Sequence, residues 1–144
     1  MNRAASFTAP ESVDQIRSVV LVGPQGTGKS ALVEQLVTGQ LGHVKEAEDP
    51  STELGVVTAV HEETGTVVTL VDTPGRPDFV GDVRAGLRAA DAVLFVVAAG
   101  SGIDEATRML WRECAAVGIP RAVAVTQLEL ARADWDQVVA ECGR

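Results

Sequence analysis

The chain has 144 residues, a length that suits one domain with a single hydrophobic core. Hydrophobic residues make up 46% of the sequence and charged residues 22%, which is typical of a globular protein. The formal net charge of −8 argues against direct binding to DNA or to an anionic membrane, because both would repel the chain.

The first residues predict a flexible leader over 1–16, which is rich in Ala, Ser and Thr. We expect residues 17–144 to form the domain. The leader has no hydrophobic signal core, and no apolar run approaches the roughly 20 residues of a membrane span, so we expect a cytoplasmic protein. In a reducing compartment, Cys114 and Cys142 should pack as small apolar side chains rather than form a disulfide.

The first regular element is expected to be a strand over 17–22, apolar enough to be buried on both faces. A helix over 29–38 follows, with an inward stripe formed by Leu32, Val33 and Leu36. Between them lies the pattern G-x-x-x-x-G-K-[ST], which forms a phosphate cradle when a strand precedes it and a helix follows. The predicted cradle residues are Gly23, Pro24, Gln25, Gly26, Thr27, Gly28, Lys29 and Ser30.

Each part of this cradle has a chemical role. Gly26 and Gly28 allow backbone conformations closed to residues with a Cβ atom, so that successive N–H groups can converge on one anion. The Lys29 ammonium would reach the terminal phosphates, and the Ser30 hydroxyl would bind Mg²⁺. The N-terminus of the helix directs its partial positive charge at the same place. The alternative is an ordinary glycine-rich turn.

The next part of the chain predicts an acidic loop and then a hairpin. Residues 41–55 lack periodicity, and a long loop beside a phosphate cradle is usually functional. Two β-rich runs over 56–60 and 66–71 flank a turn at 63–65, which predicts an antiparallel hairpin. Asp72 follows the second of these strands.

Helices and strands alternate in the rest of the chain. We expect helices over 78–90, after Asp104 and over 134–142, and strands over 93–97 and 121–126. The helix that Asp104 caps would end at Gly118 and carry one face formed by Ala106, Leu110, Cys114 and Val117.

This order predicts an α/β fold with a mostly parallel sheet, helices on both faces and one antiparallel edge strand from the hairpin. Ligands bind such sheets at the carboxyl ends of the strands, where both the phosphate cradle and Asp72 fall.

The tetrapeptide Asp72-Thr73-Pro74-Gly75 is the second candidate group. An Asp at the end of a buried strand is placed to contact Mg²⁺ through a water molecule, and Gly75 offers an unobstructed N–H group to a terminal phosphate. Alone, this tetrapeptide is a plausible β-turn. Its occurrence about forty residues after a phosphate cradle favours the binding of a nucleoside triphosphate.

Together with Pro77-Asp78-Phe79 and the run that continues to Asp91, these motifs resemble the GTP-binding domain of the translational GTPases. Elongation factor G and its divergent relatives in high-GC bacteria are the most similar, over about residues 18–141. The resemblance implies a P-loop NTPase fold, GTP or GDP with Mg²⁺ as cofactors, GTP hydrolysis, and a ribosome contact through further domains. It assigns nucleotide contacts to Asp72, Thr73, Pro74 and Gly75, and the metal to Ser30 and, through water, Asp72.

Two departures from that family concern the γ-phosphate. Arg76 stands where the family has a His that orients the attacking water. An Arg stays protonated and cannot act as a base, but it would stabilise charge on the transferred phosphate if it turned inward, so it is the candidate catalytic residue. In the first mobile loop, Val57 replaces a Mg²⁺-binding Thr, and Thr58 is one place away, on the opposite face of a strand.

A third departure concerns the base. The family reads guanine with Asn-Lys-x-Asp, and the matching residues here are Thr126, Gln127 and Glu129. Glu129 carries the charge of the Asp on a longer stem, and Gln127 lacks the cation that braces the base and the phosphate cradle. Such a site should discriminate guanine from adenine less sharply. The alternative is an ordinary junction between a strand and a loop.

Relative to that family, the chain stops before the last strand and its covering helix, so we expect an incomplete GTP-binding domain. Exposed apolar surface and open backbone groups would then lead to marginal stability or association. Three functions remain open: GTP binding with weak or lost hydrolysis, a catalytically inactive nucleotide-binding regulatory module, and an ATP-using P-loop enzyme.

Overall fold

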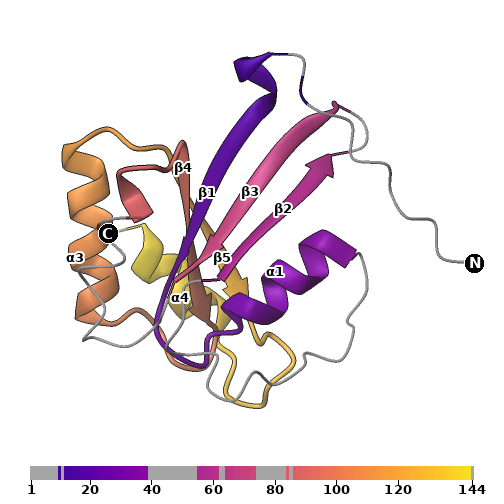
Figure 1. Cartoon of the computed structure of the whole chain (residues 1–144). Coiled ribbons are helices and arrows are strands. Elements are labelled where there is room, and N and C mark those ends of the chain that lie inside the picture. The colour runs from indigo at the N-terminus through magenta and orange to yellow at the C-terminus, as the bar shows by residue number, and fades with distance from the viewer. Residues whose placement is uncertain are drawn as a thin grey trace, which may run out of the picture.

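One sheet organises the molecule, and the computed structural model describes residues 10, 12–38, 55–61, 64–73, 84 and 86–143. Its five strands lie in the order β2-β3-β1-β4-β5 (Figure 1). All neighbouring pairs are parallel except β2 and β3. The strands are β1 (Ile16–Val22), β2 (Gly55–His61), β3 (Thr66–Asp72), β4 (Ala92–Ala98) and β5 (Arg121–Thr126). The predicted mostly parallel sheet with one antiparallel edge strand is confirmed.

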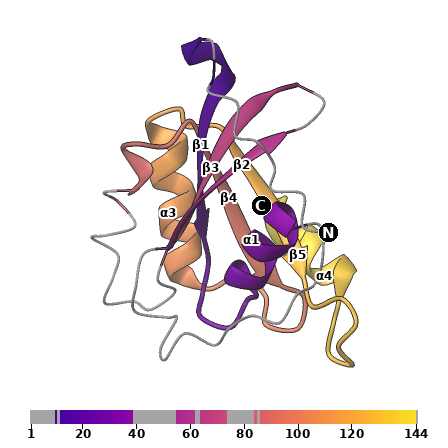
Figure 2. The same ribbon diagram turned by 45° about the vertical axis from the view of Figure 1, so that its right-hand side comes forward.

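The helices cover both faces of this sheet, as predicted. α1 lies on one face and α3 on the other (Figures 1 and 2). Successive residues of β1 alternate between the two cores, with Leu21 under α1 and Val20 and Val22 on the α3 side. The helical elements are the 3-10 turn η1 (Val13–Gln15), α1 (Lys29–Thr38), α3 (Glu105–Ala116) and α4 (Trp135–Cys142).

Some expected segments lie outside the described residues. The predicted leader and the acidic loop lie largely outside the described residues. The same holds for most of the predicted helix over 78–90, of which residues 84 and 86–87 are helical, whereas 88–90 are described but not helical, so the helix ends earlier than expected. None of the helices in the described ranges is long and apolar enough to cross a membrane.

The strands nearest the centre of the sheet are the most buried. In β4, Phe95 and Val96 point to opposite faces and are each at most 1% exposed, as expected for a parallel strand covered on both sides. The first strand was expected over 17–22 and buried on both faces, but β1 already begins at Ile16, and both Ile16, which is 42% exposed, and Arg17 are exposed. β4 pairs only with the part of β1 from Val19 onward, so the start of β1 has no neighbour on that side.

Two expected core positions are wrong. Leu36 is 54% exposed, and Val37 packs against the sheet instead. Val33 and Val37 are four residues apart and therefore lie on nearly the same side of α1. Val117 is 71% exposed because α3 ends at Ala116, so Val117 leaves the helical face that Leu110 and Cys114 share.

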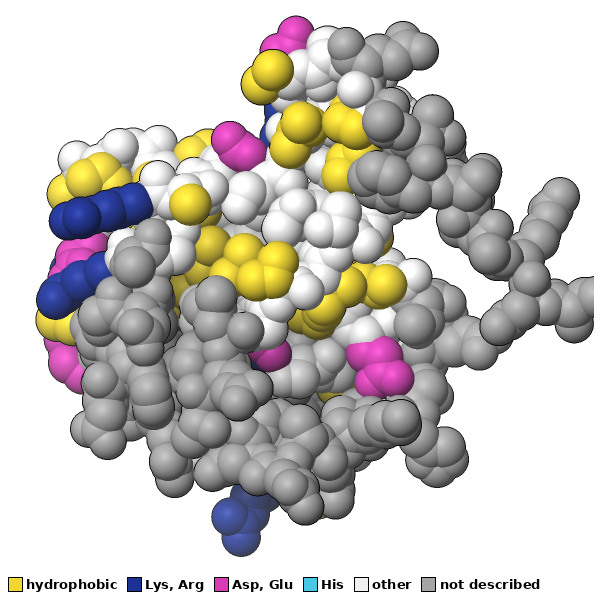
Figure 3. Space-filling model, viewed as in Figure 1, with side chains coloured by type: hydrophobic (Ala, Val, Ile, Leu, Met, Phe, Trp, Pro, Cys, Tyr) yellow, Lys and Arg dark blue, Asp and Glu magenta, His cyan; other side chains and the backbone are white. Residues whose placement is uncertain are grey.

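The predicted N-cap Asp104 is present, and Asp134, which was expected to be the first residue of the last helix, is the N-cap of α4 instead. Asp104 accepts a hydrogen bond from the Thr107 N–H at 2.8 Å, and Asp134 accepts one from the Gln137 N–H at 2.9 Å. The outer surface of α3 carries basic and acidic side chains next to one another (Figure 3). Glu113 of α3 forms an ion pair with Arg84 at 2.6 Å.

A cavity of about 530 Å³ lies between α3, α4 and the strands β4 and β5. Trp111 in its wall packs edge-on against Phe95 with ring centroids 5.0 Å apart, and the Arg121 guanidinium lies 4.3 Å from the Trp111 ring centroid. None of the predicted nucleotide-binding residues that the structure describes lines this cavity. The cavity and the phosphate cradle are therefore separate features of the fold.

The two cysteines are free, as expected, but they differ in access. Cys114 is 1% exposed, whereas Cys142 is half-buried in the cavity wall. Burial raises the pKa of both thiols, so both should react slowly. We expect iodoacetamide at pH 8 to alkylate Cys142 first and Cys114 only after unfolding, which peptide mass spectrometry of timed samples measures. Equal rates in the folded protein would contradict this prediction, and Cys142→Ser should remove the faster reaction.

Candidate nucleotide-binding site

The turn between β1 and α1 needs its glycines for two different reasons. Gly26 and Gly28 have φ angles of 81° and 86°, which residues with a Cβ atom rarely adopt. A Cβ atom at either position would meet no heavy atom within 4 Å, so the turn is open there. At Gly23, by contrast, a Cβ atom would collide with the carbonyl oxygen of Val96. The sequence predicted the unusual backbone conformation at Gly26 and Gly28. It did not predict the requirement for glycine at position 23, because that depends on how closely β4 approaches the turn.

Lys29 lies inside this turn rather than on the surface. Its side chain is 7% exposed, and its ammonium donates hydrogen bonds to the carbonyl oxygens of Gly23 at 2.8 Å and Pro24 at 2.9 Å. Burial lowers the pKa of the Lys29 ammonium, and the negative charge of Asp72 opposes that shift. The ammonium has three donors, of which these carbonyl groups occupy two.

The backbone N–H groups of the turn are available to a ligand. Those of Gly26, Gly28, Lys29 and Ser30 donate to no acceptor within the described part of the chain. The first N–H groups of a helix have no partner inside the helix, and the helix dipole adds partial positive charge there. Amide donors of this kind beside an ammonium form a site for an anion. This is the arrangement that the sequence predicted.

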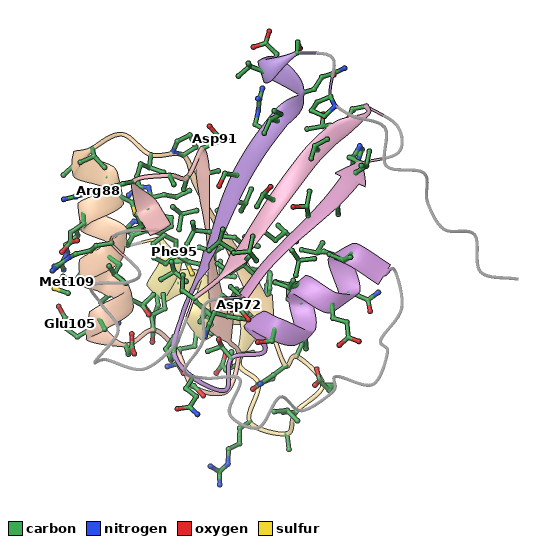
Figure 4. The ribbon with its side chains drawn as sticks, viewed as in Figure 1. Asp72, Arg88, Asp91, Phe95, Glu105 and Met109 are labelled. Carbon is green, nitrogen blue, oxygen red and sulfur yellow. The ribbon has the colours of Figure 1, made fainter. Side chains whose placement is uncertain are left out.

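Asp72 faces the start of α1 from the end of β3 (Figure 4). The Ser30 hydroxyl donates to Asp72 Oδ2 at 2.5 Å, and the other oxygen, Oδ1, is buried with no hydrogen-bond partner among the residues that the structure describes. Leu21 and Asp72 are register partners in the parallel pair of β1 and β3, and the Thr73 hydroxyl donates to the Leu21 carbonyl at 2.6 Å. The sheet therefore brings Ser30 and Asp72 together, as predicted.

The end of β5 is attached to the same turn. The Thr126 hydroxyl donates to the Thr27 carbonyl at 2.6 Å, and the Gln127 side-chain amide donates to the Gly26 carbonyl at 2.7 Å. Gln127 has a φ of 59°, which turns the chain sharply after the strand. The neutral amide of Gln127 thus keeps a link to the phosphate cradle. The sequence did not predict the hydrogen bond from Thr126, because its acceptor on Thr27 is 99 residues away along the chain.

Other predicted site residues are not brought into this group. Glu129 is exposed in the turn after β5 and forms no hydrogen bond or ion pair with any described residue. Pro74, Gly75 and Arg76 lie outside the described residues. On β2, the Thr58 hydroxyl lies 3.4 Å from that of Thr69 on the neighbouring strand.

Comparisons with known proteins identify the family. The family model described as the elongation factor Tu GTP binding domain matches residues 14–144. An elongation factor G-like protein of Mycobacterium tuberculosis is 45% identical over 94% of this chain, and one of Thermotoga maritima is 32% identical over 90%. The chain spans only 21% and 20% of the lengths of these two relatives.

Solved structures agree on the fold. The crystal structure of the protein ttk003000868 from Thermus thermophilus aligns with a TM-score of 0.73 and 33% identity, over 88% of this chain and 21% of that one. Translation elongation factor SelB from Methanococcus maripaludis aligns with a TM-score of 0.69 and 20% identity, over 88% of this chain and 25% of that one. By its phosphate cradle, its sheet and these matches, the chain belongs to the family of elongation factor Tu GTP binding domains.

Proposed function

We propose that this chain binds guanine nucleotide through the turn between β1 and α1 and the end of β3, within a domain that spans residues 17–144. The observation that carries the proposal is the group of N–H donors around the buried Lys29 ammonium that have no acceptor among the described residues. The nucleotide-binding residues on the phosphate side are those of 23–30 and 72–75. On the base side they are Thr126, Gln127 and Glu129. The SelB structure is described as a complex with the GTP analogue GPPNHP, which supports this choice of ligand.

We also propose that the nucleotide is bound together with Mg²⁺. Mg²⁺ prefers oxygen ligands, and the Ser30 hydroxyl is hydrogen-bonded to Oδ2 of Asp72, whose other oxygen, Oδ1, has no hydrogen-bond partner among the described residues. The described residues contain no group of three or more His, Cys, Asp or Glu side chains that could hold a metal. We propose that phosphate oxygens and water supply further ligands, as is usual for Mg²⁺. When bound, the ion would neutralise charge on the phosphates.

Hydrolysis is proposed to be weak. Arg76 cannot accept the proton of an attacking water, so its proposed role is limited to stabilising charge on the transferred phosphate. The relatives extend well beyond the part that this chain matches, and we propose that such a longer protein would act in translation at the ribosome, in the cytoplasm. A catalytically inactive regulatory module is the alternative, and GTP turnover that disappears in Lys29→Ala would exclude it.

Fluorescence titration with a labelled GTP analogue tests the proposal. We expect saturable binding that GTP competes for more strongly than ATP, and that weakens when EDTA removes Mg²⁺. No binding by a folded sample would refute nucleotide binding, and stronger competition by ATP would favour an ATP-using enzyme.

The contribution of Asp72 to the metal can be tested separately. Asp72→Asn keeps the shape of the side chain but loses the negative charge that favours a divalent cation. We expect the Mg²⁺ concentration for half-maximal GTP binding to rise about 10- to 100-fold, the range seen when a residue that orients a metal ligand is replaced. Asp136→Asn, on the exposed surface of α4, is the matched control and should leave this concentration unchanged. Equal Mg²⁺ dependence in the two variants would show that Asp72 does not act through the metal.

A further inference from the structure

β2 is an edge strand that lacks the usual protection against pairing with another chain. In the described sheet it has one neighbour, β3, and it lies at the margin of the sheet (Figure 1). Its sequence Gly-Val-Val-Thr-Ala-Val-His contains no Lys, Arg, Asp, Glu or Pro, the residues that commonly protect edges. Val56, Val57 and Val60 are 58%, 37% and 38% exposed. The outer side of β2 therefore offers a row of backbone donors and acceptors flanked by apolar side chains.

We propose that β2 pairs antiparallel with β2 of a second copy of this chain, about a twofold axis at Thr58 and perpendicular to the sheet. Such an axis keeps the α3 side of both copies on the same face of a continuous sheet. Residues that face each other must then have numbers that differ by an even amount, because side chains alternate between the faces. The pairing centred on Thr58 meets this condition.

The side chains of β2 are complementary to themselves in this register. On the α3 side, Val56 lies opposite Val60 of the second copy, and Thr58 lies opposite its own equivalent. On the α1 side, Val57 lies opposite Ala59. At the ends of the strands, His61 lies opposite Gly55; all other pairs join apolar or small side chains, and no pair opposes like charges.

The pairing of β2 with β3 inside the chain provides a precedent for the contact between the two Thr58 side chains. Thr58 already lies opposite Thr69 of β3, with hydroxyl oxygens 3.4 Å apart. A second Thr pair across the axis would repeat this contact on the other side of β2. Apolar side chains also reach the surface in the upper part of Figure 3, where the tips of β1, β2 and β3 lie. Dimerisation would cover part of this surface.

Sedimentation velocity over a range of concentrations of the 144-residue chain tests the proposal. We expect the weight-average mass to rise from that of a monomer toward that of a dimer, and Thr58→Lys to raise the dissociation constant at least tenfold. The substitution would bring two ammonium groups together on the axis, while Thr58 is exposed in the single chain. Val117→Lys adds the same charge at an exposed site beyond α3 and should leave the dissociation constant unchanged. Far-UV circular dichroism of both variants establishes that they are folded.

Disulfide trapping tests the register. In a Cys142→Ser background, oxidation should link Thr58→Cys into a covalent dimer, because directly opposed Cβ atoms are close. Ala59→Cys should link much more slowly, because its equivalent is offset by two residues. A monomer at every concentration would overturn the proposal. Equal rates of disulfide formation at Thr58→Cys and Ala59→Cys would also overturn it. So would a dimer that persists in Thr58→Lys but dissociates in Ala124→Lys, which lies on the other edge strand, β5. None of these results depends on nucleotide binding.

Discussion

Replacing Lys29 with methionine should weaken the binding of a labelled GTP analogue by about 100-fold or more, which corresponds to about 2.8 kcal/mol. The ammonium is buried in the turn and held by the carbonyl groups of Gly23 and Pro24, so its charge is placed for the phosphates before any ligand arrives. Methionine preserves the length and packing of the stem but removes the charge.

The control for this substitution is Arg112→Met. It also removes one positive charge, but from an exposed position on α3, where the side chain is 74% exposed. We expect its affinity for the GTP analogue to equal that of the original chain within twofold. If both variants lost affinity equally, net charge rather than the position of Lys29 would explain binding.

Lys29→Met also provides a test of the buried charge without any ligand. Because the pKa of Lys29 is lowered on folding, the unfolded chain binds its proton more tightly than the folded chain. The free energy of unfolding should therefore rise as the pH increases through the interval between the lowered pKa and the ordinary value of 10.5. Urea titrations at several alkaline pH values should show this rise, and it should be absent in Lys29→Met.

Substituting alanine for Gly23 should lower the free energy of unfolding by about 2–3 kcal/mol. The added Cβ atom would collide with the carbonyl oxygen of Val96, and that oxygen belongs to the most buried strand of the sheet and has little room to move. Either β1 and β4 separate or the turn shifts away from β4. Both changes would displace the N–H donors, so GTP affinity should fall as well. Urea denaturation and the fluorescence titration measure the two effects.

Gly86→Ala is the matched control. A Cβ atom at Gly86 would lie 3.7 Å from the Val20 side chain, an ordinary van der Waals contact. The residue is helical, so alanine should leave the stability unchanged or raise it by up to about 1 kcal/mol. If Gly23→Ala were as stable as Gly86→Ala, the close approach of the turn to β4 would be wrong.

The local sequence determined much of the candidate site. The bounds of α1 and β5 agree with the patterns that predicted them, and the positive φ angles at Gly26 and Gly28 are those that a phosphate cradle requires. These features depend on backbone preferences and on contacts within a few residues, so a short stretch of sequence carries their signal. The position of Asp72 at the end of a strand was predictable for the same reason.

Only the tertiary structure decided which distant groups meet. The bond from Thr126 to the carbonyl of Thr27, and the closeness of Gly23 to Val96, depend on which strands become neighbours in the sheet and on their register. The exposure of Arg17 at the start of the predicted strand likewise follows from where β4 begins to pair with β1. Spacing along a chain specifies local conformation, but contacts between remote residues arise only when the whole sheet packs.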